Sequence, residues 1–201
     1  MKVIGLNGSA NTNGNTKKIL YNILKHLETM GVSTEIIDIH PIVSDLRSPF
    51  CTVCSSPCNG KCYQGTLLEE AFQKLQRADG ILMGSPSYYG TLSGQIKCFF
   101  DKSRKMRTNK GLYNKIAAGV TVGASKYGGQ ETTMKALHDI MLVHGMIIIG
   151  DGFWEEDCGH HGVCVHSPFE SDEIAFKRCE ILAKRMYEVC LNTMNLRINK
   201  F

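Results

Sequence analysis

Four cysteines crowd into one short stretch of the chain. They are Cys51, Cys54, Cys58 and Cys62, with the spacing C-x2-C-x3-C-x3-C. Thiolates on a short loop that also bears glycine and proline can surround an iron-sulfur cluster or a single zinc ion. Zinc sites usually separate two cysteine pairs by a longer spacer, so this crowding favours a cluster. The alternatives are a zinc ion that braces the loop and thiols that are reactive or merely structural.

A second stretch suited to chemistry is rich in hydroxyl and amide side chains. It runs from Gly8 to Thr16, between a short apolar run and a segment with helical periodicity. The free N–H groups and partial positive charge of a helix N-terminus bind anions such as phosphate. The glycine patterns of dinucleotide and nucleoside-triphosphate loops do not occur here, which leaves a monophosphate such as that of FMN. The alternative is an ordinary turn with Asn15 or Thr16 as the helix N-cap.

Composition limits the class of protein. With 201 residues, 43% of them hydrophobic, the chain suits one α/β domain over residues 1–201. A net charge of +4 is too weak to indicate nucleic acid, although it favours anionic cofactors or an acidic partner. No apolar run is long enough for a membrane span, and Met1 to Val3 leads into a predicted strand rather than a signal peptide. We therefore expect a cytoplasmic protein without membrane or nucleic-acid partners, in which Cys98, Cys179 and Cys190 are buried thiols on helices.

The elements that must position these residues alternate between strand and helix. Strands are predicted over 3–6, 32–39, 80–84, 116–122 and 146–149, and helices over 19–30, 67–75, 96–103, 134–141 and 171–192. The segments 42–65 and 150–168 show no sustained period and are expected to be irregular. This alternation predicts a parallel sheet with helices on both faces. Ligands of such sheets bind beyond the carboxyl ends of the strands, where three glycine- and hydroxyl-rich loops are expected.

The order of those three loops resembles the NADPH-dependent FMN reductase branch of the flavodoxin-like superfamily. The similarity rests on the loop from Gly8 to Thr16, on the segment from Gly84 to Lys102 and on Gly128-Gly129-Gln130-Glu131, and it runs from Val3 to about Gly150. It implies a three-layer flavodoxin-like sandwich with strand order 2-1-3-4-5 and FMN as cofactor. The FMN-binding residues that it implies are Ser9, Asn11, Asn13, Asn15 and Thr16 in the first loop, Pro86, Ser87, Tyr88, Tyr89 and Gly90 in the second, and Gly123, Ala124, Ser125, Gly128 and Gly129 in the third. The alternative for Tyr88 and Tyr89 is that they only cap the core.

The four-cysteine stretch, placed between the second strand and the second helix, resembles the iron-sulfur flavoprotein family. The compact cysteine motif of that family binds a [4Fe-4S] cluster, which implies Cys51, Cys54, Cys58 and Cys62 as metal ligands. The family has two residues between its second and third cysteines and at least four before the last, whereas both gaps are three here.

Histidines and cysteines also occur together in Cys158-Gly159-His160-His161-Gly162-Val163-Cys164, expected at the carboxyl edge of the sheet. Metal binding by Cys158, His160, His161 and Cys164 is one interpretation. The resemblance to flavodoxin-like quinone reductases implies instead that this loop and His144 lie near a flavin. His161 is then a candidate catalytic proton donor to the flavin or the substrate. A surface histidine without a role is the alternative.

These features together predict an FMN protein that moves electrons between a reduced donor, a [4Fe-4S] cluster and an acceptor. The donor is ferredoxin or NAD(P)H, and the acceptor is a protein or a small molecule such as a quinone or an oxygen species. By analogy, the cysteine loop reaches toward a neighbouring subunit of a homodimer or homotetramer. Two rival functions are a cluster-free NAD(P)H-dependent quinone or FMN reductase and a zinc-braced module that binds FMN without turnover.

Overall fold

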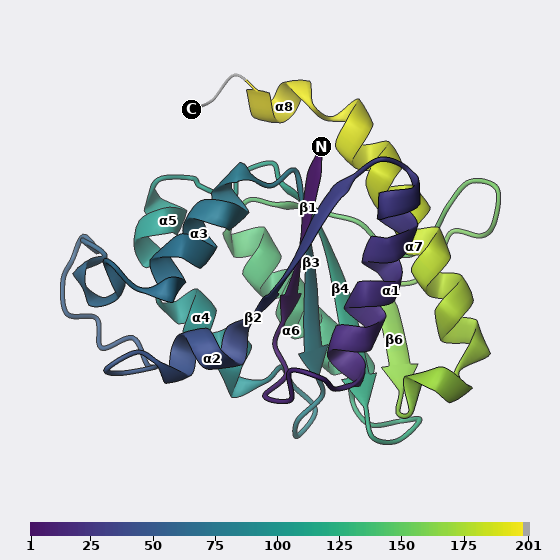
Figure 1. The fold of residues 1–201 in the computed structure, drawn as a ribbon, viewed down its shortest axis with the longest axis horizontal. Coiled ribbons are helices and arrows are strands. Elements are labelled where there is room, and N and C mark those ends of the chain that lie inside the picture. The colour runs from purple at the N-terminus through teal and green to yellow at the C-terminus, as the bar shows by residue number, and fades with distance from the viewer. Residues whose placement is uncertain (199–201) are drawn as a thin grey trace.

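The centre of the molecule is a parallel sheet. We analysed a computed structural model that describes residues 1–198. Strands β1 (Lys2–Asn7), β2 (Ser33–Asp38), β3 (Gly80–Pro86), β4 (Ile116–Gly123) and β5 (Ile147–Ile148) lie in the order β2-β1-β3-β4-β5, and β6 (Val163–His166) also pairs with β4 (Figure 1). All pairs are parallel. The predicted order of the five strands is confirmed.

The far end of the sheet differs from the prediction because a sixth strand completes it. Ile147 and Ile148 pair only with Ile116 and Ala117, and the chain then leaves the sheet. It returns as β6, which pairs with β4 from Val120 to Gly123. The two arms of the intervening loop touch backbone to backbone, since a Cβ at Gly150 would lie 2.1 Å from the carbonyl oxygen of His160. This close approach of the arms leads the chain back to β4, so the segment 150–168 is not irregular throughout.

Helices cover both faces of the sheet, and side-chain alternation in the strands gives each face its own core. Helices α1 (Asn15–Thr29) and α7 (Glu173–Asn192) lie side by side over one face (Figure 1). The buried side chains of this core include Val3, Leu82 and Val120. The second core buries Ile4, Leu6 and Ile81 under the other helices. These are α2 (Ile39–Ser44), α3 (Leu67–Arg77), α4 (Gly94–Asp101), α5 (Arg104–Thr108) and α6 (Gln130–Val143).

Short elements complete the chain. Helix α2 differs from the prediction, which placed Ile39 at the end of a strand and residues 42–44 in an irregular segment. Pro41 fits the helix because the first turn needs no N–H from it, and Ile42 and Val43 are buried. Two 3₁₀ turns lie at Lys61–Tyr63 and Phe169–Ser171, and α8 (Asn195–Ile198) follows α7. Cys98, Cys179 and Cys190 are buried, as predicted. Among the described residues, no helix is long and apolar enough to cross a membrane.

Candidate functional site

The loops that follow β1 and β3 meet at the carboxyl edge of the sheet. The Gly8 N–H donates to the Gly84 carbonyl over 2.8 Å, and the Ser93 hydroxyl donates to the Gly8 carbonyl over 2.6 Å. A Cβ at Gly8 would lie 2.3 Å from Cγ1 of Ile96, so only glycine fits between β3 and the first turn of α4. The backbone of the first loop is therefore fixed by its neighbours.

Side chains organise the loop from Gly8 to Thr16 internally. The Ser9 N–H donates to Oδ1 of Asn7, the Asn11 N–H to Oγ of Ser9, and the Asn13 N–H to Oδ1 of Asn11, at 3.0–3.2 Å. Each bond closes a small side-chain turn that holds the backbone in a fixed path. The structure thus places Ser9, Asn11 and Asn13 in one rigid segment directly before α1.

The N-terminus of α1 is open to an anion. Its N-cap is Gly14, so the alternative that Asn15 or Thr16 caps the helix is wrong, and no side chain accepts a bond from the first turn. The Lys18 N–H is the first to reach a carbonyl, that of Gly14. The preceding N–H groups, from Asn15 to Lys17, have no acceptor within the helix. With no acidic residue in this turn, their dipoles favour a bound phosphate.

A fourth loop, after β6, joins the same edge and was not predicted. The Asn15 side-chain amide donates to the Ser167 hydroxyl over 2.6 Å, and the Ser167 N–H donates to the Gly123 carbonyl over 2.9 Å. Its sequence signal was the alternation of Val163, Cys164 and Val165 followed by Ser167-Pro168, which parallels Ser85-Pro86 at the end of β3. Ser167 is therefore a site candidate that sequence reasoning missed.

The loop after β3 presents a tyrosine to solvent. Tyr88 and Thr91 exchange backbone hydrogen bonds of 2.9 and 3.1 Å, which makes Tyr89 and Gly90 the centre of a tight turn. Both have positive φ, 51° and 74°. Holding a non-glycine residue there costs about 1–3 kcal/mol, and such strain concentrates at functional sites. Tyr89 is fully exposed and Tyr88 about half exposed, so the alternative that both cap the core is wrong.

The loop after β4 packs against this turn. The Ser87 hydroxyl donates to the Gly128 carbonyl and the Thr132 hydroxyl to the Gly90 carbonyl, at 2.8 and 2.7 Å. Gly129 has a φ of 83°, and a Cβ there would lie 2.7 Å from Cα of Gly90. The 86–90 loop and the 123–129 loop therefore form two joined walls beside the N-terminus of α1. Exposed Ala124 and Ser125 lie on the second wall.

The cysteine-rich loop forms a separate hollow. Its volume is about 310 Å³, and its lining includes all four clustered cysteines together with the cations Arg47, Lys102 and Arg104. All four cysteines are free thiols. Partial burial raises the pKa of the Cys62 thiol; the positive charge of Lys102 opposes that rise, and the other three cysteines add to it.

Three contacts anchor the cysteine loop to the helices beneath. The Tyr63 ring packs edge-on against Phe72, with ring centres 5.1 Å apart, and burial raises the Tyr63 pKa to about 12. The Arg104 guanidinium donates to the Ser55 carbonyl over 3.4 Å. Gly60 has a φ of 73°, and a Cβ there would lie 2.8 Å from the Lys105 side chain. The loop thus rests on α3 and α5, to one side of the sheet (Figure 1).

The arrangement of sulfurs bears on what the hollow can hold. Within residues 1–198, no three His, Cys, Asp or Glu side chains form a group that could hold one metal ion. An iron-sulfur cluster makes a different demand, because its cysteines bind separate iron atoms around a shared core. Four thiols spaced around a hollow with three cations fit a negatively charged cluster of this kind.

Helix α4 connects the two candidate sites. The loops of residues 8–16, 86–90 and 123–129 carry the residues expected to bind FMN, and they are called the flavin-type loops; the edge of the sheet at which they meet is the flavin-type edge. The N-cap of α4, Ser93, donates to Gly8 at this edge, and its C-cap, Lys102, lines the cysteine hollow. At 1.5 Å per residue, its eight residues span about 12 Å. The two sites therefore lie at opposite ends of one short helix.

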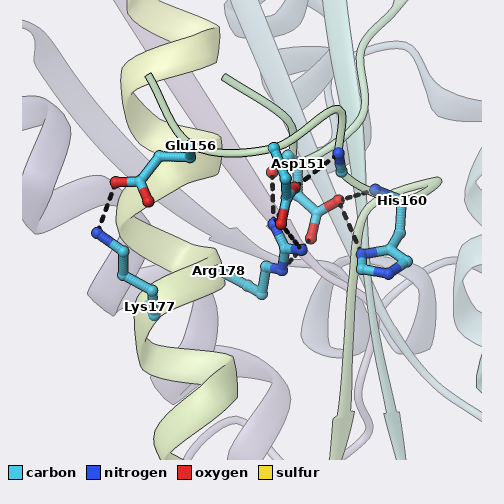
Figure 2. A network of polar contacts seen from close by, with 7 residues as sticks. Asp151, Glu156, His160, Lys177 and Arg178 are labelled. Atoms are coloured by element: carbon cyan, nitrogen blue, oxygen red, sulfur yellow. Dashed lines mark hydrogen bonds and ion pairs between the residues drawn. The ribbon is translucent and has the colours of Figure 1, made fainter. Parts of the chain in front are cut away.

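The histidine-rich loop is held by ion pairs rather than gathered around a metal (Figure 2). The buried Asp151 carboxylate accepts the His160 N–H and lies 3.4 Å from Nε of Arg178. Arg178 also binds both carboxylate oxygens of Asp157, at 2.8 and 2.9 Å, and lowers the pKa of that carboxyl. Lys177 pairs with Glu156 at 2.7 Å. These contacts fasten the loop to α7.

The cysteines and histidines of this loop do not assemble. The Cys164 sulfur accepts the Thr121 hydroxyl, the exposed His161 ring lies 6.1 Å from the ring of His138, and Cys158 is exposed. The prediction that the loop lies at the carboxyl edge is wrong, because the loop comes before β6, and β6 itself then runs to that edge, where His166 pairs with Gly123. As a candidate catalytic residue, His161 thus lies before β6 rather than among the flavin-type loops.

His144 is also misplaced by the prediction. It is the C-cap of α6, at the opposite end of that helix from the flavin-type loops, and is only 7% exposed. Its Nε2 lies 3.0 Å from the Ser103 hydroxyl, and its ring packs against Phe100. Burial lowers its pKa to about 4. It is a neutral core residue under α4 and α5.

Comparison with known proteins gives matches over most of the chain. A family model described as NADPH-dependent FMN reductase matches residues 1–161. An iron-sulfur flavoprotein of Methanocaldococcus jannaschii is 35% identical over 195 residues, which cover 94% of this chain and 97% of that protein. An iron-sulfur flavoprotein of Methanosarcina thermophila is 32% identical over 192 residues, covering 94% and 95%. A shorter match, 36% over 84 residues, is to an NAD(P)H dehydrogenase (quinone) of Trichlorobacter lovleyi and covers 42% of this chain.

Solved structures confirm the predicted flavodoxin-like fold. A WrbA-like flavodoxin from Agrobacterium tumefaciens has a TM-score of 0.66 and 20% identity, and the match covers 95% of this chain and 97% of that one. A flavodoxin from the domain Archaea has a TM-score of 0.62 and 18% identity, with 95% and 99% covered.

Proposed function

The chain belongs to the iron-sulfur flavoprotein family, within the NADPH-dependent FMN reductases, and we propose that it transfers electrons between a reduced donor, a [4Fe-4S] cluster and an acceptor. Membership makes it an FMN-dependent oxidoreductase. The observation that carries the finer proposal is the hollow of four free thiols and three cations at the far end of α4 from the flavin-type loops. Bound FMN supplies both two-electron and one-electron chemistry, and a cluster supplies one-electron chemistry.

The carboxyl edge of the sheet fits FMN. The open N-terminus of α1, with Asn15 and Thr16, would hold the phosphate through neutral N–H groups. The walls made by residues 86–90 and 123–129 would lie on either side of the flat ring, where Tyr89 offers an aromatic face. Close packing of Gly90 and Gly129 holds the two walls together.

The cysteine hollow fits the cluster. Cys51, Cys54, Cys58 and Cys62 would be its ligands, and the cations around them would offset the negative charge of four thiolates. Helix α4, about 12 Å long, would connect the two sites within one chain.

The donor and acceptor are proposed by class. Ferredoxin would deliver single electrons at the cysteine loop, whereas NAD(P)H would deliver a hydride at the flavin ring. A groove of about 1010 Å³ borders the wall at Gly129 and Gln130 and could admit a quinone, an oxygen species or part of a protein acceptor. Phe50 and Val53 of the cysteine loop are well exposed. A homodimer or homotetramer would cover them and bring one cluster toward the flavin of its partner.

A second candidate function is a cluster-free NAD(P)H-dependent quinone reductase. The specific observation in its favour is the match to a protein named NAD(P)H dehydrogenase (quinone) over 84 residues. In that case the four cysteines would play no part in turnover.

The deciding experiment is metal, sulfide and flavin analysis of protein purified without oxygen. About four iron and four acid-labile sulfide per FMN would support the proposal. FMN without iron would overturn it in favour of the cluster-free reductase, and zinc in place of iron would make the cysteine loop structural. Stopped-flow reduction by NADPH and by ferredoxin, followed at flavin and cluster wavelengths, then identifies the donor.

A further inference from the structure

Lys102 is a largely buried residue that lines the cysteine hollow. The residue is 4% exposed, and among the described residues no carboxylate forms an ion pair or a hydrogen bond with its side chain. Charged lysines are seldom buried unless a partner offsets the loss of water. Its position as the C-cap of α4 places it against the cysteine hollow, which it lines together with all four clustered thiols.

Sulfurs are among the groups near this ammonium. Lys102 interacts electrostatically with the thiols of Cys62 and Cys98. Lys115, the other buried lysine, differs because it has the carboxylate of Asp79 as an electrostatic partner. Arg47 and Arg104 also line the hollow, but Arg47 is exposed and Arg104 partly so. Water screens those two charges more than it screens Lys102.

We propose that Lys102 is a positioning residue that raises the reduction potential of the cluster held by the four cysteines. This inference rests on the proposed function. Reduction adds one electron to the cluster and makes and breaks no bond, so the site gains one negative charge. A cation beside the ligands stabilises the more negative state more than the less negative one, and a largely buried side chain holds that cation near the cluster. Lys102 binds no iron, and its effect is electrostatic.

The test is an anaerobic redox titration of three variants, with the cluster followed by electron paramagnetic resonance and the flavin by absorbance. Lys102→Met removes the charge and keeps the side-chain length, and Lys102→Arg restores a charge. The matched control is Lys61→Met, since Lys61 is exposed and adjoins Cys62. We expect Lys102→Met to weaken cluster reduction about tenfold, which is a fall of about 59 mV for one electron. The cluster potentials of Lys102→Arg and Lys61→Met should stay close to that of the parent protein.

The flavin serves as an internal reference, because it would lie at the other end of α4. A fall in cluster potential with an unchanged flavin potential, in Lys102→Met that retains its iron and sulfide, supports the inference. An unchanged cluster potential in Lys102→Met that retains its iron and sulfide overturns it. If Lys102→Met does not fold, Lys102→Gln is judged by the same criterion. Parent protein without iron would overturn the proposed function itself, and the inference with it.

Discussion

The flavin-type edge and the cysteine hollow are built by opposite means. At the edge, loops leave buried strands and are joined by backbone bonds such as Gly8 to Gly84, so backbone N–H groups form the binding surface. The hollow is lined by residues of the long connection between α2 and α3 together with Lys102 and Arg104, and four of its lining residues are cysteines. A site of the first kind depends on close packing, whereas one of the second kind depends on the identity of a few side chains.

Charge separates the two regions as well. Near the edge, Lys17 pairs with Asp38 and Lys18 with Glu170, so the helix N-terminus offers mainly neutral donors. In the hollow, the described residues provide no ion pair for Arg47, Lys102 or Arg104. Neutral donors at the N-terminus of α1 would bind the phosphate of an exchangeable cofactor. The cations in the hollow would offset the charge of a permanently bound anionic cluster. The two sites should therefore fail independently.

The largest expected effect is the loss of the metal centre on Cys54→Ala. Because each cysteine would bind a separate iron atom, removal of one should reduce iron and sulfide about tenfold or more. FMN content should stay at the parent level, since Cys54 lines the separate cysteine hollow. Inductively coupled plasma analysis and the flavin spectrum measure both quantities. Cys158→Ala, which removes an exposed thiol outside the hollow, is the control and should keep its iron. Joint loss of iron and FMN in Cys54→Ala would show that the regions are coupled.

Acidification should lower the free energy of unfolding through His144, which is buried beneath the cysteine loop. A hollow of about 480 Å³ is lined by Cys51, Val53 and His144. Burial lowers the His144 pKa to about 4, below its ordinary value of 6.5. The unfolded chain binds a proton as the pH falls through 6.5, whereas the folded chain does not until about 4. His144 should thus lower the free energy of unfolding by up to about 3 kcal/mol across that window.

Urea unfolding of His144→Leu between pH 7 and pH 4 measures this contribution. The variant should lose less stability on acidification than the parent. His161→Gln is the matched control, because the His161 ring is exposed, and it should retain the acid sensitivity of the parent. Equal pH dependence of parent and His144→Leu would mean that His144 is protonated in the folded state.

The fold was largely predictable from the sequence, because buried strands and amphipathic helices leave strong patterns. The order of β1 to β5 follows from the alternation of these patterns and the resemblance that they support. Strand β6 was missed because it has only four residues and follows a loop rich in glycine. Its place depends on long-range pairing with β4, which no local pattern reveals.

The site was predictable where local sequence determines it. Gly8 and the polar loop before α1 have a clear signature, and so do the four cysteines. Ser167 was missed because its contact with Asn15 joins segments far apart in the chain. Lys102 gave no signal, since a lysine after Asp101 looks like any solvated charge until the fold buries it. His144 was misplaced because a resemblance indicated a flavin neighbour, whereas α6 carries the residue to the other end of the sheet.

Gly8→Ala should damage the flavin-type edge while sparing the hollow. The new methyl group would lie 2.3 Å from Ile96 and 2.8 Å from the Gly84 carbonyl, so the loop must shift. Overpacking of this kind costs about 1–3 kcal/mol in unfolding free energy, and FMN affinity should fall with it. Gly94→Ala is the control, because open space surrounds that position. Fluorescence titration with FMN and iron analysis measure the outcome. Parent-like FMN affinity would show that Gly8 does not shape the site.

The smallest expected effect is that of Asn15→Asp, which tests whether a negative charge at the open N-terminus of α1 weakens FMN binding. Asn15→Asp would place a carboxylate beside the expected phosphate and remove the amide that donates to Ser167. We expect FMN binding about tenfold weaker, or about 1.4 kcal/mol. A negative charge in the first turn should meanwhile stabilise the helix of the FMN-free protein by about 0.3–1 kcal/mol, which offsets part of the lost bond. Weaker binding without a matching loss of stability would therefore locate the phosphate at this turn. An unchanged dissociation constant would show that this turn is not part of the flavin site. Asn109→Asp is the control for the change in net charge.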